Sequence, residues 1–202
     1  MYLYPKWIRL WHLLNALFCL MLIITGLCLQ YSGKGRPLIP FDKAVALHNT
    51  GGIALSLSYF IFFLGNIFSP NKKHYRLKYK GLWKDMYTQF NYYMFGVFKG
   101  QKHPFPVTEE NKFNPLQKVS YVLIMYIALP LIIITGWGLL LPDITISRVF
   151  GVSGLILTDI IHIISGFIIS IFMIIHIYLC TLGSTPGSLF KGMISGYHVG
   201  ED

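Results

Sequence analysis

The sequence has few charged residues, and acidic residues are especially scarce. Asp and Glu together number 8 among 202 residues, against 17 Lys and Arg, and charged side chains make up only 12% of the chain. Apolar side chains make up 54%. An average soluble domain has about 25% charged residues, so this composition argues against a soluble globular protein. The formal net charge of +9 would by itself suggest nucleic-acid binding, but the distribution of the basic residues indicates another origin.

Cysteine is also scarce, and its three residues form no recognisable ligand motif. Cys19, Cys28 and Cys180 lie outside any CxxC or CxxCH pattern. A covalently attached c-type haem and an iron–sulfur cluster on this chain are therefore not expected. All three cysteines suit small apolar positions in a packed core.

Long apolar segments are abundant where charge is missing. A helix needs about 20 apolar residues to cross a bilayer, and four segments meet that length. They are Leu10–Tyr31, Val45–Phe68, Leu116–Leu141 and Ile160–Leu182. The sequence thus predicts an all-α integral membrane protein, a bundle of four transmembrane helices that forms a single domain over residues 1–202. The longest connection covers residues 69–115.

The basic residues are unevenly divided between the two sides of this predicted bundle. If the N-terminus lies inside, 13 of the 17 Lys and Arg fall on the inner side, in the termini, in residues 69–115 and at Lys118. The outer loops hold the other four, which are Lys34, Arg36, Lys43 and Arg148. Cytoplasmic loops carry an excess of Lys and Arg, so both termini are predicted to lie inside. The expected location is the cytoplasmic (inner) membrane of a bacterium or an archaeon, and no nucleic-acid partner is expected.

Three connecting or irregular segments carry their own expectations. Residues 81–100 mix aromatic residues with Lys and predict an interfacial helix in contact with membrane lipid, either as a docking surface or as an ordinary surface helix. Pro130 is expected to kink the third helix. Residues 142–154, before the fourth helix, are expected to include a short surface helix.

The two halves of the chain share short similar stretches. LIITGL at 22–27 matches IIITGW at 132–137, and the segment 48–52 matches the segment 162–166, each beginning with His and ending with Gly. A helix pair duplicated in parallel orientation would explain both matches. Chance similarity between apolar stretches is the alternative.

Two histidines on the fourth predicted helix are the most informative residues. His162 and His176 are fourteen residues apart. That separation is about 21 Å and about four helical turns, so both side chains project to nearly one face. Ionisable side chains inside a membrane are costly and mark functional sites. The histidines of the polar inner segments are instead expected to be solvated; these are His74, His103 and His198.

The direction of each helix assigns a depth to each membrane histidine. His12 begins an outward helix at the inner surface, whereas His48 begins an inward helix at the outer surface. His162 begins the inward fourth helix and His176 lies near its inner end. His48 is therefore matched with His162 outside, and His12 with His176 inside. Imidazole is a common axial ligand of haem iron, and two histidines leave no open position for a substrate. We predict two haem b groups with these four histidines as axial ligands of the haem iron, and electron transfer as their use.

Two further points bear on this haem prediction. Gly51, Gly52 and Gly166 follow the outer histidines closely, where small residues either admit a flat macrocycle or simply allow close helix packing. Zinc is the weaker alternative to haem, because the histidine pairs have no Cys or carboxylate partners at tetrahedral spacing.

Four motifs at the helix ends carry a resemblance that covers nearly the whole chain. They are Trp7-Ile-Arg9-Leu-Trp-His12, His48, Asn114-Pro-Leu-Gln117-Lys118-Val-Ser-Tyr121, and His162-x13-His176. Together they resemble the membrane cytochrome b subunits of respiratory formate dehydrogenases, nickel–iron hydrogenases and thiosulfate reductases. The resemblance implies a four-helix di-haem protein that exchanges electrons between a peripheral redox subunit and membrane quinone. It also implies the same two histidine pairs as the depth argument.

The same resemblance implies a quinone site beside the inner haem. Carried over to this chain, it points to Asn114 and Gln117, with Lys118 and His176 nearby. A quinone carbonyl needs hydrogen-bond donors, and quinone reduction needs protons from the adjacent water. Asn114 also suits the N-cap of the third helix, with Pro at the first helical position, and both roles are compatible. For Lys118, an anchor on the basic inner side is the favoured interpretation.

The resulting functional prediction is a quinone-reactive subunit of a multi-subunit oxidoreductase, with menaquinone or ubiquinone as its substrate. An iron–sulfur or multihaem redox subunit is expected on the outer face, and no residue of this chain is predicted to be catalytic. A stand-alone quinone-linked electron carrier, such as a superoxide oxidase, is one alternative. A haem-free membrane anchor subunit is the other.

Overall fold

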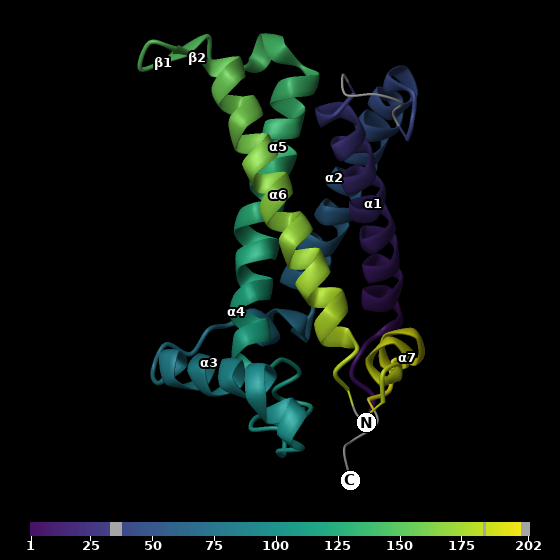
Figure 1. Ribbon diagram of the computed structural model, residues 1–202, viewed down its shortest axis with the longest axis vertical. Helices are drawn as coiled ribbons and strands as arrows, with labels where there is room; N and C mark the ends of the chain where they lie inside the picture. Colours follow the sequence, from purple (N-terminus) through teal and green to yellow (C-terminus); the bar gives the residue numbers. More distant parts are fainter. Residues whose placement is uncertain (33–37, 184, 199–202) are drawn as a thin grey trace. The chain divides into compact units, whose positions relative to one another are not determined.

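The computed structural model describes residues 1–32, 38–183 and 185–198, and its described parts are mostly helical. Two of the outer basic residues, Lys34 and Arg36, lie outside the described residues. Four helical segments are long and apolar enough to cross a membrane: Lys6–Gln30, Phe41–Phe68, Pro115–Leu140 and Gly154–Cys180. They correspond to α1 (Lys6–Gln30), α2 (Phe41–Phe68), α4 (Pro115–Leu123) with α5 (Leu129–Leu140), and α6 (Gly154–Cys180) (Figure 1). The prediction of an all-α protein with four membrane spans is confirmed.

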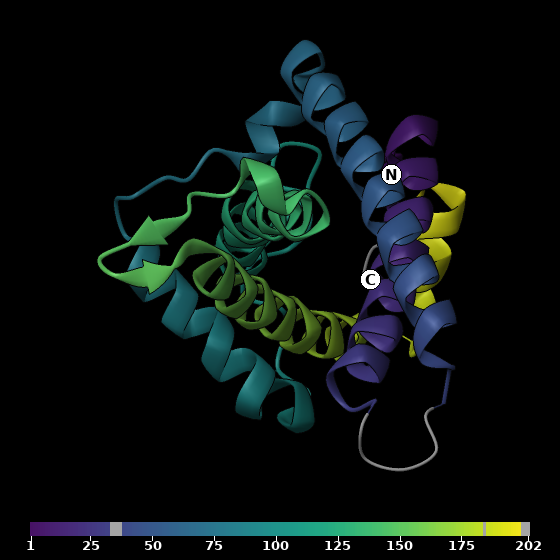
Figure 2. The same cartoon turned by 90° about the horizontal axis from the view of Figure 1, so that it is seen from above.

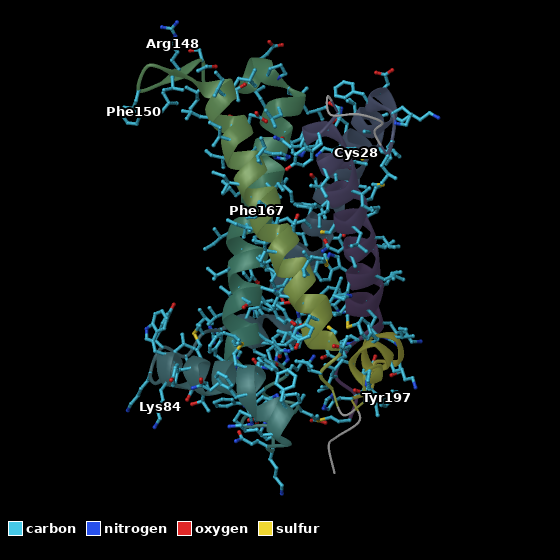
Figure 3. All side chains as sticks on the ribbon, viewed as in Figure 1. Cys28, Lys84, Arg148, Phe150, Phe167 and Tyr197 are labelled. Carbon is cyan, nitrogen blue, oxygen red and sulfur yellow. The ribbon has the colours of Figure 1, made fainter. Side chains whose placement is uncertain are left out.

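Three of the four observed membrane spans are longer than the predicted apolar segments, and the third has the same length. α1 begins at Lys6, and α6 begins at Gly154, whereas the apolar segment was counted from Ile160. The flanking residues extend the helices because backbone hydrogen bonding continues beyond the apolar stretch. Large apolar side chains along the spans remain exposed on the isolated chain, among them Phe167 on α6 (Figure 3). An apolar surface of this kind is expected to face lipid.

The third span contains a π-helical turn just before Pro130, where its sequence predicts a kink. A π-helical turn, η4 (Ile124–Ala128), separates α4 from α5, and Pro130 lies in the first turn of α5. Proline has no backbone N–H, and its ring clashes with the carbonyl of the preceding turn. A widened turn accommodates both effects, and such turns are recognised sites of helix distortion.

The connection before α6 differs from its prediction. A single 3₁₀ turn, η5 (Pro142–Ile144), is followed by a short hairpin of β1 (Arg148–Val149) and β2 (Val152–Ser153). The turn places Phe150 at φ 49° and Gly151 at φ 83°, and glycine adopts such values readily. The expected surface helix is therefore limited to η5. Phe150 at the hairpin tip is fully exposed and projects from the hairpin (Figure 3).

The chain divides into two compact units, each built from several segments. Unit 1 comprises Met1–Arg9, Gly65–Ile127 and the residues from Ile174 onward. Unit 2 comprises Leu10–Leu64 and Ala128–Met173. Every membrane span contributes residues to both units, and a single domain over residues 1–202 stays a prediction.

Unit 1 holds both chain termini. Tyr2 and Tyr197 form an antiparallel bridge, and the N-terminal amine donates a hydrogen bond of 3.1 Å to the carbonyl of His198. Arg9 donates to the carbonyl of Ile194 in α7 (Ser188–Ser195), where helix carbonyls lack intrahelical partners. Residues 65–127 belong to the same unit. An even number of spans requires the termini and this loop to share one side.

The predicted interfacial helix is present in unit 1. It consists of α3 (Leu82–Asn91), a π-helical turn η2 (Tyr92–Gly96) and a 3₁₀ turn η3 (Val97–Lys99). α3 lies across the N-terminal end of α4 (Figure 1). Trp83 and Tyr87 are exposed on it, and Lys84 projects from it (Figure 3). Contact of this surface with lipid stays a prediction.

Cysteines introduced at positions 84 and 148 are expected to be labelled from opposite sides of the membrane. Lys84 belongs to the basic loop and Arg148 to the hairpin before α6, which the charge distribution assigns to the inside and the outside. The measurement uses a membrane-impermeant maleimide on intact cells, in a chain with Cys28 and Cys180 replaced by Ala. Labelling of Lys84→Cys from outside would reverse the predicted topology and every depth derived from it.

Candidate functional site

His48 and His162 face each other in unit 2. Their ring centroids are 6.2 Å apart and the ring planes cross at 75°. An imidazole nitrogen bonds a metal ion at about 2 Å, so two rings on opposite sides of one ion have centroids about 6 Å apart. The structure thus brings together the predicted outer pair at a separation that fits one iron atom between them.

Each of these histidines is held by a threonine of the neighbouring helix. Thr25 Oγ1 lies 2.9 Å from His48 Nδ1, and Thr135 Oγ1 lies 3.0 Å from His162 Nδ1. α1 and α2 run side by side, as do α5 and α6, which places each threonine opposite its histidine (Figures 1 and 2). Both threonines are buried, with exposed fractions of 1% and 6%. The contacts leave the Nε2 atom of each ring as the position for a metal.

Glycines shape the space around the pair. A Cβ atom at Gly26 would lie 3.4 Å from His48 Cε1, and one at Gly136 would lie 3.2 Å from His162 Cε1. Four residues after each histidine the surroundings are open, since a Cβ at Gly52 would meet no atom within 4 Å and one at Gly166 would meet only an Ile132 methyl at 3.7 Å. Open space on the ligand-bearing face fits a flat macrocycle. Gly51 differs, because a Cβ there would clash with Met21, which indicates close helix packing.

The internal similarity of the sequence has a structural counterpart in unit 2. Thr25-Gly26 contacts His48 in the same way as Thr135-Gly136 contacts His162. The two stretches that carry these pairs are the matching segments 22–27 and 132–137. Recurrence of the same contacts favours duplication over chance similarity.

The chemistry of the site favours haem over a tetrahedral metal ion. Within residues 1–32, 38–183 and 185–198, no group of three or more His, Cys, Asp or Glu is placed to hold a metal together. A structural zinc site needs four such ligands, whereas haem iron needs only two axial ligands from the protein. The facing imidazoles supply that number.

The predicted inner histidines fall into different units. His12 is half-buried on α1 in unit 2, and His176 is half-buried on α6 in unit 1. The His176 ring lies edge-on to Tyr121, with centroids 5.9 Å apart, and its Nε2 is 3.9 Å from Cys180 Sγ. The pairing of His12 with His176 stays a prediction.

The other residues of the first motif have packing roles. In unit 1, Trp7 fills the space beside Gly65, where a Cβ would lie 2.9 Å from the indole ring. In unit 2, Trp11 stacks on Phe62 with centroids 4.3 Å apart and donates a 3.0 Å hydrogen bond to the carbonyl of Ser58. These contacts join α1 to α2.

Asn114 is the N-cap of α4, which is one of the two roles that the sequence predicts for it. Its Oδ1 accepts a 2.9 Å hydrogen bond from the backbone N–H of Gln117, and Gln117 Oε1 accepts a 3.2 Å bond from the Asn114 N–H. This reciprocal arrangement is a capping box. The box uses the oxygen of each amide, so it does not involve the amide nitrogens that a quinone carbonyl needs.

Tyr93 contacts Asn114, a contact that sequence reasoning missed. Asn114 Nδ2 donates a 2.7 Å hydrogen bond to the Tyr93 hydroxyl oxygen. Burial raises the pKa of Tyr93, against the lowering effect of the Asn114 hydrogen bond, so the phenol stays protonated. Because its oxygen accepts from Asn114, its hydrogen can be donated to another acceptor. A helix-borne tyrosine far from Asn114 in sequence gives no signal of this contact.

His74 was predicted to be solvated, and that prediction is wrong. Its exposed fraction is 4%, and its ring lies edge-on to Phe113 with centroids 6.3 Å apart. Burial, followed by the charges of Lys112, Lys73 and Lys118, lowers the pKa of His74 to about 4. The ring is therefore neutral at physiological pH and acts as a core residue.

The other two histidines predicted to be solvated are half-buried. They are His103, whose ring lies 4.9 Å from that of Tyr92, and His198, which accepts a bond from the N-terminal amine.

Comparison with known proteins agrees with this architecture. The family model described as prokaryotic cytochrome b561 matches residues 3–196. The chain is similar to a putative cytochrome, YdhU, of Escherichia coli K12, with 40% identity over 198 residues that cover 98% of this chain and 74% of the relative. It is also similar to a probable Ni/Fe-hydrogenase B-type cytochrome subunit of Rhodobacter capsulatus, with 24% identity over 229 aligned positions that cover 100% of this chain and 82% of the relative. No solved structure gives a significant match.

A family match over nearly the whole chain agrees with the four membrane spans and the facing histidines. Haem b is the cofactor that defines a b-type cytochrome. The chain therefore belongs to the prokaryotic cytochrome b561 family and is a multi-pass membrane cytochrome of b type that carries electrons.

Proposed function

We propose that this chain holds two haem b groups and carries electrons across its membrane. The observation that supports the proposal best is the facing pair of His48 and His162, each fixed by a buried threonine. His48 and His162 would hold the outer haem, and His12 and His176 the inner one. Bound haem b would take up and release one electron at a time, and its two axial histidines leave no position for a substrate.

We propose that a quinone binds at the inner side, near the start of α4. Asn114 and Gln117 supply amide N–H groups there, and Tyr93 supplies a phenol hydrogen. His176 lies in the same unit, with its ring against Tyr121 of α4. The polar segment 69–113 that adjoins this region gives protons a route from water. Menaquinone and ubiquinone both present the carbonyl oxygens that such donors would bind.

A peripheral redox subunit is the proposed partner on the outer face, where it would exchange electrons with the His48–His162 site. Support comes from the Rhodobacter capsulatus relative, which is described as a probable Ni/Fe-hydrogenase B-type cytochrome subunit. Purification in mild detergent, followed by subunit identification, tests this proposal. An iron–sulfur or multihaem subunit in the complex would support it. A chain that purifies alone and reduces quinone with superoxide would support the stand-alone carrier instead.

Fully loaded protein is expected to contain two haem b groups per chain. The reason is that four histidines in the spans form two pairs matched by depth. A pyridine haemochrome assay combined with quantitative amino-acid analysis measures the ratio. A ratio of one would exclude the inner site or the outer site, and a ratio of zero would favour the haem-free anchor.

A further inference from the structure

We propose that Thr25 and Thr135 are positioning residues that set the tautomer and the donor strength of the outer histidine pair. This inference rests on the proposed role of His48 and His162 as iron ligands. Each threonine would keep the hydrogen of its histidine on Nδ1, which leaves the lone pair of Nε2 directed at the metal. Both would thereby tune the reduction potential of the outer haem.

The hydrogen bonds of Thr25 determine the direction of its contact with His48. A hydroxyl has one hydrogen, and Thr25 Oγ1 lies 2.8 Å from the carbonyl of Met21, one turn earlier on α1. The hydroxyl donates to that carbonyl, so at 2.9 Å its oxygen accepts from His48 Nδ1. This contact therefore places a hydrogen on Nδ1 of the imidazole.

The same arrangement occurs a second time. Thr135 Oγ1 lies 2.8 Å from the carbonyl of Leu131 and 3.0 Å from His162 Nδ1. A threonine can bond its own helix backbone without any other partner. Such local bonding does not explain why both hydroxyls also contact an imidazole on a different helix.

A fixed Nδ1–H bond alters the metal that the ring binds. A partner that accepts this hydrogen raises the basicity of Nε2 and orients the ring. A more basic ligand stabilises ferric over ferrous iron, which lowers the reduction potential. Loss of the threonine oxygen should therefore raise the potential and weaken haem retention. The burial of both threonines prevents water from replacing the lost acceptor.

The experiment uses the full chain in detergent with its haem bound. Thr25→Val and Thr135→Val keep the shape of the side chain and remove the hydroxyl. Each is expected to make the midpoint potential of the outer haem more positive and to speed haem transfer to excess apomyoglobin by about tenfold. Thr25→Ser and Thr135→Ser keep the hydroxyl and should restore both values. The potential of the inner haem should not move in any variant.

Thr158→Val is the matched control. Thr158 also bonds a backbone carbonyl of its own helix, that of Gly154 at 2.9 Å. In the Thr158→Val variant, the midpoint potential of the outer haem and the haem transfer rate should equal those of the wild type. Unchanged potentials in Thr25→Val and Thr135→Val, with haem still bound, would overturn the inference. His48→Ala tests the underlying site separately, since a variant that keeps both haems would refute the ligand assignment itself.

Discussion

Alanine at His48 or at His162 is expected to halve the haem content of the protein. Both rings face one position in unit 2, with centroids 6.2 Å apart, so each substitution removes an axial ligand of the same iron. The two variants should therefore lose the same absorption component and the same step in a redox titration. His12→Ala and His176→Ala should instead remove the other component. Haemochrome content and potentiometric titration measure both effects.

Retention of the second haem distinguishes ligand loss from general misfolding. His103→Ala is a suitable control, because His103 lies outside the four spans and should leave both haems in place. If His48→Ala and His176→Ala lose the same component, the depth-matched pairing is wrong. In that case the ligands would pair along another combination of helices.

Removal of the Asn114 amide is expected to lower quinone-linked turnover by about tenfold, because a buried carbonyl without a donor loses about 1–3 kcal/mol. Asn114→Leu removes both the amide donor and the cap of α4. The loss of the cap alone costs about 1 kcal/mol of stability. Quinol-dependent haem reduction, normalised to haem content, measures turnover per intact molecule. Both haem spectra should remain unchanged.

Asn114→Ser separates the two roles of this residue. Serine is a good N-cap, so α4 keeps its first hydrogen bond while the amide donor to Tyr93 is lost. Slow turnover in both variants supports the quinone role, and Tyr93→Phe should then be slow as well. If Asn114→Ser has normal turnover and only Asn114→Leu loses thermal stability, Asn114 is a cap and does not contribute to a quinone site.

The membrane spans could be predicted because their signal is local. A run of about 20 apolar residues has the same meaning wherever it occurs, and the rule needs no knowledge of tertiary contacts. The depth of each histidine follows from span order alone, which is why His48 and His162 could be matched before the structure placed their rings together. The ends of the helices were less predictable, because hydropathy marks the apolar part of a helix and α6 begins at Gly154.

The supporting residues were harder to predict. Thr25 and Thr135 lie in apolar helices, where a hydroxyl normally bonds its own backbone, so composition gives no sign of a partner on the next helix. The repeated Thr-Gly pair in segments 22–27 and 132–137 was the available signal. It becomes informative only when both threonines are seen against histidines.

Residues between the spans were the least predictable. His74 is buried, and its ring lies edge-on to Phe113, which is distant in sequence. The hairpin before α6 depends on a turn at Phe150 and Gly151 that short hydropathy patterns do not reveal. Both outcomes depend on packing and turn geometry, which a single sequence does not specify.

The bridge between the two chain ends has a consequence for biogenesis. Residues at positions 2 and 197 pair with each other, and Arg9 bonds a carbonyl of α7. The ribosome releases the N-terminal residues long before residues 194–197, so they must wait for these partners until that segment has been translated. Formation of these contacts between the N-terminal residues and residues 194–197 is therefore a late step of maturation. A bulky fusion at either end would hinder it, even though both ends lie outside the lipid-spanning helices.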